Sequence, residues 1–161
     1  DQNFHARFSA KGKIYRYTVW NHPVMQPLLR DRASHVPHEI DPIRLREACE
    51  LFTGRHDFAA FSLRRTNEPE QTIRTISSIQ AEIHGSQIQL TFEGEGFLHK
   101  MVRLISAAII RHAIGKVGLQ DLKNSLQNGA PTFGLVAPAC GLSLVRVLYE
   151  DSNSQSEKVA A

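Results

Sequence analysis

The chain has 161 residues, of which 42% are hydrophobic and 22% are charged. That length suits a single domain with a real core, and no apolar stretch is long enough to span a bilayer. The formal net charge of +3 permits an anionic partner without requiring one. We therefore expect one globular domain over residues 1–150, followed by a flexible polar tail over residues 151–161.

The N-terminal residues and the cysteines indicate the cellular compartment of the protein. There is no secretory signal, and the first residues resemble the middle of a protein, which suggests a cut at a domain boundary. The two cysteines, Cys49 and Cys140, are far apart and favour reduced thiols. These features predict a cytoplasmic protein.

Two strands are predicted near the N-terminus. Residues 4–8 alternate apolar and polar side chains, and residues 14–20 are rich in β-branched and aromatic side chains, with a turn at residues 11–13 between them. Tyr15 and Tyr17 share one face of the second strand.

A helix is predicted next, with Asp41 as its N-cap, Pro42 at its first position and Gly54 ending it. Its apolar positions follow helical spacing and are Leu45, Ala48, Cys49 and Phe52. Residues 54–58 and 63–72 are predicted to be loops.

A hairpin follows, with strands at residues 74–83 and 88–93 around a turn at Gly85. An amphipathic helix is predicted from about Leu98 to Gly115. A shorter helix at residues 119–126, closed by Asn128-Gly129, and a last strand at residues 142–149 complete the order. This order predicts an α+β fold, in which an antiparallel or mixed sheet is flanked by helices.

The start of the helix near Leu98 carries three cations, His99, Lys100 and Arg103. A helix N-terminus already bears partial positive charge, so cations there suit a bound phosphate or carboxylate. The alternative is a solvated basic face.

Aromatic and basic side chains also alternate around Tyr15 and Tyr17. The flanking cations are Arg7, Lys11, Lys13 and Arg16. Stacked bases and phosphates require such a mixture, although core packing of the tyrosines is the competing interpretation.

Other chemistries lack support in the sequence. His35 and His38 have no third ligand at matching spacing, so we expect a surface loop and no metal. The turn at residues 94–96 lacks the lysine and the further glycines of a phosphate-binding loop.

Four segments together resemble the A-type tRNA pseudouridine synthase family, and residues 74–76 also fit. The four are Phe4-His5-Ala6-Arg7-Phe8-Ser9-Ala10 with Tyr15-Arg16-Tyr17, Gly54-Arg55-His56-Asp57-Phe58-Ala59-Ala60-Phe61, Gly96-Phe97-Leu98-His99-Lys100-Met101-Val102-Arg103, and Ala137-Pro138 with Gly141-Leu142-Ser143-Leu144-Val145.

The resemblance implies the C-terminal half of a pseudouridine synthase fold, in which two related halves share a continuous sheet. It also implies a homodimer that needs no cofactor or metal and isomerises uridines at positions 38–40 of the tRNA anticodon stem-loop. By the same resemblance, Tyr15 stacks on the target base, Arg103 pairs with the catalytic aspartate, and Arg7 and Leu144 lie near the substrate.

Six further cations are candidates for RNA binding, and we expect them to gather with Arg7 on one surface. They are Lys11, Arg16, Arg64, Arg65, Lys100 and Arg111.

The sequence departs from the family at three places. Glu95 replaces a usual Asn or Gln, and Ser143 replaces a common Tyr. The segment Arg-Thr-Asp-x-Gly-Val-His, which carries the nucleophile, lies upstream of Phe4 in the family and is absent here. We therefore expect the 161-residue chain alone to be inactive. The alternative is an RNA-binding module without chemistry of its own.

Overall fold

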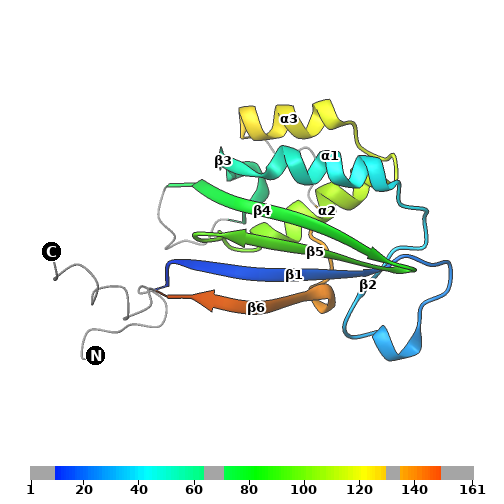
Figure 1. Ribbon diagram of the computed structural model, residues 1–161. Coiled ribbons are helices and arrows are strands. Elements are labelled where there is room, and N and C mark those ends of the chain that lie inside the picture. The colour runs from blue at the N-terminus through cyan, green and yellow to red at the C-terminus, as the bar shows by residue number, and fades with distance from the viewer. Residues whose placement is uncertain (1–9, 64–70, 130–134, 150–161) are drawn as a thin grey trace, which may run out of the picture.

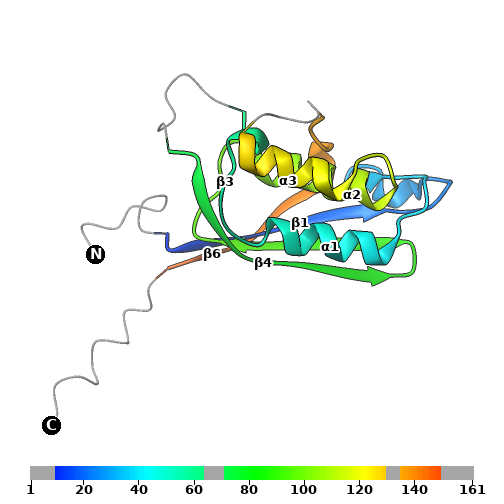
Figure 2. The same cartoon turned by 90° about the horizontal axis from the view of Figure 1, so that it is seen from above.

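The computed structural model describes residues 10–63, 71–129 and 135–149. Within these ranges, six strands form one sheet, and the helices lie on one side of it (Figures 1 and 2). The strands are β1 (Gly12–Trp20), β2 (Ser34–His35), β3 (Gly54–Asp57), β4 (Ile73–His84), β5 (Gln87–Gly94) and β6 (Leu142–Leu148). The helices are α1 (Pro42–Phe52), α2 (Met101–Ala113) and α3 (Leu119–Asn128), and short 3-10 turns span Pro27–Leu29, Ala59–Phe61 and Ala139–Gly141.

The sheet is mixed. Its order is β2-β1-β5-β4-β3, and β6 also pairs with β1. The pairs of β1 with β5 and with β6 are antiparallel, whereas the short pair of β1 with β2 is parallel. The predicted α+β class with flanking helices is confirmed, as are the hairpin of β4 and β5 and the two predicted helix ends at Gly115 and Gly129.

The core lies between the sheet and the helices. Tyr17 of β1 and Leu90 and Phe92 of β5 are fully buried, while the alternate residues of both strands are partly exposed. This alternation is expected of a sheet with one covered face. The predicted apolar positions of α1, from Leu45 to Phe52, are all buried as well. Burial of each large side chain of this kind contributes roughly 1.5–3 kcal/mol.

Helix α2 is buried nearly all round, so its burial extends beyond the apolar stripe predicted for it. Every residue of α2 is buried except Arg103 and Arg111. The reason is its central position, since α2 contacts both α1 and β1. A helix that is enclosed on most sides needs small or apolar side chains around its circumference.

Three predicted boundaries were wrong. Gly12 and Lys13 belong to β1 and not to a turn, because they pair with Leu148 and with Gly94. Residues 54–57 form β3 and not a loop, because they pair with β4. Helix α2 begins at Met101 and not near Leu98. In each case pairing or backbone geometry outweighed local residue preference. The predicted strand at residues 4–8 and the tail at residues 151–161 lie outside the described residues.

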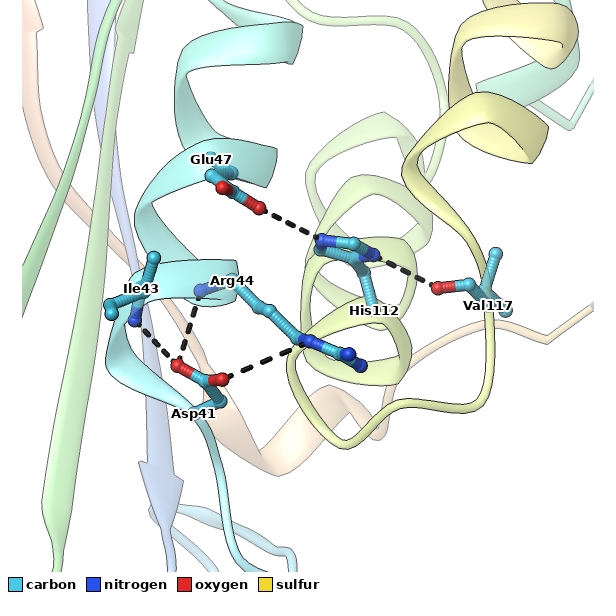
Figure 3. Close-up of polar contacts among 6 residues, drawn as sticks. All are labelled: Asp41, Ile43, Arg44, Glu47, His112 and Val117. Atoms are coloured by element: carbon cyan, nitrogen blue, oxygen red, sulfur yellow. Dashed lines mark hydrogen bonds and ion pairs between the residues drawn. The ribbon is translucent and has the colours of Figure 1, made fainter.

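Hydrogen bonds and ion-pair contacts join the start of α1 and the end of α2 to their surroundings (Figure 3). Asp41 accepts hydrogen bonds from the amides of Ile43 and Arg44, at 2.8 and 3.3 Å, as the sequence predicted for an N-cap. The imidazole of His112 is buried. Its Nδ1 lies 2.9 Å from the Val117 carbonyl, and its Nε2 lies 3.7 Å from a Glu47 carboxylate oxygen. His112 therefore connects α2 to α1 and to the loop before α3.

The N-cap allows a first stability prediction. We expect Asp41→Ala to lower the free energy of unfolding by about 1 kcal/mol, because two helix amides lose their acceptor. Asp41→Asn keeps an acceptor oxygen and should lose much less. Urea denaturation of the three proteins measures the difference, and equal stability of the Ala and Asn variants would contradict the prediction.

Neither cysteine is paired, as predicted: Cys49 is buried and Cys140 is partly exposed. Burial raises the pKa of the Cys49 thiol to about 12, so the thiol stays protonated and unreactive. Over the described ranges, no helix is long and apolar enough to cross a membrane. Within the same residues, no group of three His, Cys, Asp or Glu side chains is placed to hold a metal ion.

Candidate functional site

Tyr15 lies near the edge of the sheet where β1 meets β6. Its side chain is partly buried and shares the helix-covered face of β1 with Tyr17. The ring of Phe97 meets it edge to face, with centroids 5.3 Å apart and an angle of 86°. Leu144 is paired with Tyr15 across the strands, and its side chain is 52% exposed. Tyr15 and Leu144 thus give this edge an apolar and aromatic surface that a base can stack on.

Arg103 stands in the first turn of α2 and is partly exposed. Its Nε donates a hydrogen bond of 2.7 Å to the carbonyl of Ala137, and the amide of Ala137 donates one of 3.3 Å to the Arg103 carbonyl. Among the described residues, no carboxylate forms an ion pair with Arg103, and Glu95 is exposed. The guanidinium is therefore fixed through Nε, while its terminal N–H groups keep the planar fork that matches a carboxylate.

Tyr15 and Arg103 lie on the same side of the sheet. Tyr17 shows this, because its side chain shares a face of β1 with Tyr15, and its hydroxyl is close enough to Arg103 to be affected by that charge. Its hydroxyl also donates to the carbonyl of Pro138, next to the residue that holds Arg103. An aromatic ring and a directed cation thus belong to one face of the fold.

The other cations at the start of the predicted helix are placed differently. Lys100 has a left-handed backbone with φ of 59° and precedes α2. His99 also precedes the helix, and the amide of Leu63 donates to its carbonyl. The prediction that both lie in the first turns of the helix was wrong. Only Arg103 lies within the helix itself, close to the positive end of its dipole.

The described members of the predicted basic surface come from different elements, and their gathering on one surface stays a prediction. Arg16 alternates with Tyr15 and Tyr17 along β1 and so points to the open face of the sheet. Lys11 precedes β1, and its amide donates to the carbonyl of Leu148. Arg111 lies eleven positions after Lys100, about 16 Å along a helix. The remaining candidates, Arg7, Arg64 and Arg65, lie outside the described residues.

Tyr17 is fully buried, which agrees with the core-packing interpretation of its face. Two other features of the site were not predicted from the sequence. The family motif contains Phe97 without giving it a role, although its place directly after the two glycines of residues 94–96 marks it as a candidate ring neighbour. The Ala137 carbonyl gives no signal in the sequence, because every residue has a carbonyl.

Comparison with known proteins agrees with this fold and these motifs. The family model described as tRNA pseudouridine synthase matches residues 48–150. The tRNA pseudouridine synthase A of Acetivibrio thermocellus is 37% identical over 151 residues, which cover 92% of this chain and 61% of that protein. The tRNA pseudouridine synthase A of Akkermansia muciniphila is 39% identical over 162 residues, covering 96% of this chain and 61% of that protein. The protein of the same name from Bacillus licheniformis is 36% identical, covering 94% and 61%.

The mixed sheet with helices on one face is therefore a pseudouridine synthase fold. The chain belongs to the tRNA pseudouridine synthase family. It spans 61% of the length of these relatives.

Proposed function

We propose that this chain is the C-terminal catalytic domain, residues 1–150, of an enzyme that isomerises uridine to pseudouridine in tRNA. We place its target at positions 38–40 of the anticodon stem-loop. The observation that supports this best is the pairing of a stackable ring, Tyr15, with a fixed guanidinium, Arg103, on one face of a pseudouridine synthase fold. The relatives named tRNA pseudouridine synthase A support the reaction class.

The reaction places few demands on the protein beyond positioning. The uracil is detached from its ribose at N1, rotated and rejoined through C5. C5 loses its hydrogen to solvent and N1 gains a proton, so the product is an isomer of the substrate. No co-substrate is needed for that balance, and we propose no cofactor and no metal. A nucleophilic aspartate from a segment outside these 161 residues starts the reaction.

Arg103 orients that aspartate and keeps it ionised. A carboxylate next to a guanidinium is favoured in its charged form, which is the form that attacks. Because the Ala137 carbonyl holds only Nε, the two terminal nitrogens can meet the two carboxylate oxygens. A lysine ammonium has no planar fork and cannot reproduce this geometry.

Tyr15 holds the target base after it leaves the tRNA stack. A flipped base needs a ring to stack on once it has lost its neighbours. Phe97 packs on the Tyr15 ring edge to face and so restricts its orientation. Leu144 extends the same apolar surface from β6.

The stacking role gives a graded prediction in the full-length enzyme. Tyr15→Phe keeps the ring and should retain tRNA affinity, losing only what the hydroxyl does. Tyr15→Ala should weaken binding of the target base by about 1–3 kcal/mol. Single-turnover kinetics with a tRNA substrate separate binding from chemistry, and equal behaviour of Phe and Ala variants would rule out stacking.

Assembly and location complete the proposal. The enzyme acts on tRNA in the cytoplasm as a homodimer, and the basic residues Lys11, Arg16, Lys100 and Arg111, with Arg7, Arg64 and Arg65, contribute contacts to RNA. Sedimentation of the full-length protein with and without tRNA tests both the dimer and the complex.

The decisive experiment compares two lengths of the protein. Tritium release from tRNA labelled at uracil C5 reports pseudouridine formation directly. We expect turnover by the protein completed to the length of its relatives and none by the 161-residue chain. Turnover by the short chain would show that the nucleophile lies within it. RNA binding without turnover by the complete protein would favour a binding module and overturn the proposed enzyme.

A further inference from the structure

The hydroxyl of the buried residue Tyr17 binds the backbone next to the residue that holds Arg103. Tyr17 is fully buried, and its hydroxyl is 2.9 Å from the carbonyl of Pro138, which is 121 positions later in the chain. A carbonyl can only accept, so the tyrosine is the donor. This hydrogen bond links the centre of β1 to the segment that precedes β6.

The segment held in this way is the one that fixes Arg103. Ala137 precedes Pro138, and it both accepts a hydrogen bond from Arg103 Nε and donates one to the Arg103 carbonyl. Ala137 is itself buried, with 5% of its surface exposed. Two hydrogen bonds thus link Tyr17 to the guanidinium through the backbone of Pro138 and Ala137, and a third joins Ala137 to the main chain of Arg103.

Three residues after Pro138, the chain also packs directly against β1 at Gly141. A Cβ atom added at Gly141 would lie 2.7 Å from the Thr18 carbonyl oxygen and 2.9 Å from Cζ of Tyr17. Real Cβ atoms essentially never approach that closely. Gly141 therefore lets the chain pack directly on the Tyr17 ring, and the hydroxyl fixes its position along that ring.

We propose that Tyr17 is a positioning residue for Arg103, acting through the carbonyls of Pro138 and Ala137. The proposal rests on the function given above, in which Arg103 orients the catalytic carboxylate. Tyr17 does not touch the substrate, because its side chain is enclosed by the core. The hydrogen bond from its hydroxyl fixes the position of the backbone at Pro138 and Ala137. The Ala137 carbonyl in turn fixes the orientation of the Arg103 guanidinium.

The Tyr17 hydroxyl is a donor over the whole working range of an enzyme. Burial raises its pKa from 10.0 to about 12, and a hydrogen bond donated by the Ser34 side chain acts in the opposite direction. Because the folded-state pKa is raised, the stabilisation is complete below pH 10 and is lost only as the pH rises toward 12. Removal of the hydroxyl should consequently lower activity without changing the shape of the pH profile between pH 6 and 9.

The test is Tyr17→Phe in the full-length enzyme, since it deletes the hydroxyl and keeps the buried ring. We expect kcat to fall by about tenfold to a hundredfold, as for a displaced catalytic group, with an unchanged KM for tRNA. Ser125→Ala, which removes another buried hydroxyl in α3, is the matched control and should leave kcat unchanged. An unchanged kcat in Tyr17→Phe would overturn the proposal.

A double-mutant cycle shows whether Tyr17 acts through Arg103. In an Arg103→Lys background, Tyr17→Phe should cause little further loss, because the guanidinium it positions is already gone. Fully additive losses would contradict the proposal and indicate a merely structural role.

A second measurement does not depend on turnover. The Nε–H signal of Arg103 in an NMR spectrum of the ¹⁵N-arginine-labelled full-length protein is identified by its loss in Arg103→Lys. We expect faster hydrogen exchange of this proton in Tyr17→Phe and no change in Ser125→Ala. If the wild type forms no pseudouridine, the proposed function fails. If it does and the exchange is unchanged in Tyr17→Phe, only the role of Tyr17 fails.

Discussion

Arg103→Ala should reduce kcat of the full-length enzyme by about 10²–10³-fold, as the loss of a directed electrostatic partner does in other active sites. The folded protein should lose little stability, about 1 kcal/mol, because the side chain is partly exposed and makes one hydrogen bond to Ala137. Tritium release measures the first effect, and urea denaturation measures the second.

Two further variants make the Arg103 result specific. Arg103→Lys keeps the positive charge but lacks the fork, so we expect it to lose most of the activity as well. Arg46→Ala removes an exposed arginine of α1 that lies outside the site and should behave like the wild type. Normal turnover by Arg103→Ala would show that Arg103 belongs to a solvated basic surface and has no catalytic partner.

Much of the scaffold was predictable because short-range rules govern it. Asp41 and Pro42 start α1 as their chemistry requires, and Gly85 turns the hairpin between β4 and β5. These signals depend on the preferences of a few adjacent residues. They therefore survive in the folded chain.

The errors arose where distant segments decide the outcome. Residues 54–57 look like a loop until β4 supplies their hydrogen bonds. Helix α2 is buried beyond its predicted apolar stripe because α1 and β1 enclose it. Lys100 looks helical by residue preference but takes a left-handed backbone conformation that ordinary residues seldom adopt. Sequence periodicity carries no information about such tertiary partners.

The candidate site was predictable in part, and the division follows the same principle. Tyr15 and Arg103 were singled out by a family resemblance, and the structure places them on one face of the sheet. Their supports were not foreseen, since Phe97 reaches Tyr15 only after β5 has ended, and the Ala137 carbonyl comes from 34 positions beyond Arg103. Contacts of this kind depend on how close two distant segments come in the folded chain, which cannot be read from the sequence.

Gly94, near Tyr15, should be sensitive to any added side chain. It is buried at the end of β5, where it pairs with Lys13 and with Ile76 beside an irregularity in β4. A Cβ atom there would lie 2.7 Å from the Thr75 carbonyl oxygen and 3.2 Å from Cζ of Phe97. The first neighbour is backbone within the sheet and cannot move aside cheaply.

We expect Gly94→Ala to destabilise the protein by about 1–3 kcal/mol, the usual cost of overpacking a tight site. Gly96→Ala is the matched control, because a Cβ atom at Gly96 meets nothing within 4 Å. Urea denaturation should separate the two variants clearly. Gly94→Ala should also lower kcat in the full-length enzyme, since the new methyl group crowds Phe97, whose ring packs edge to face on Tyr15. Equal stability of the two alanine variants would contradict the prediction. It would show that β4 and β5 can move apart at Gly94 to make room for the methyl group.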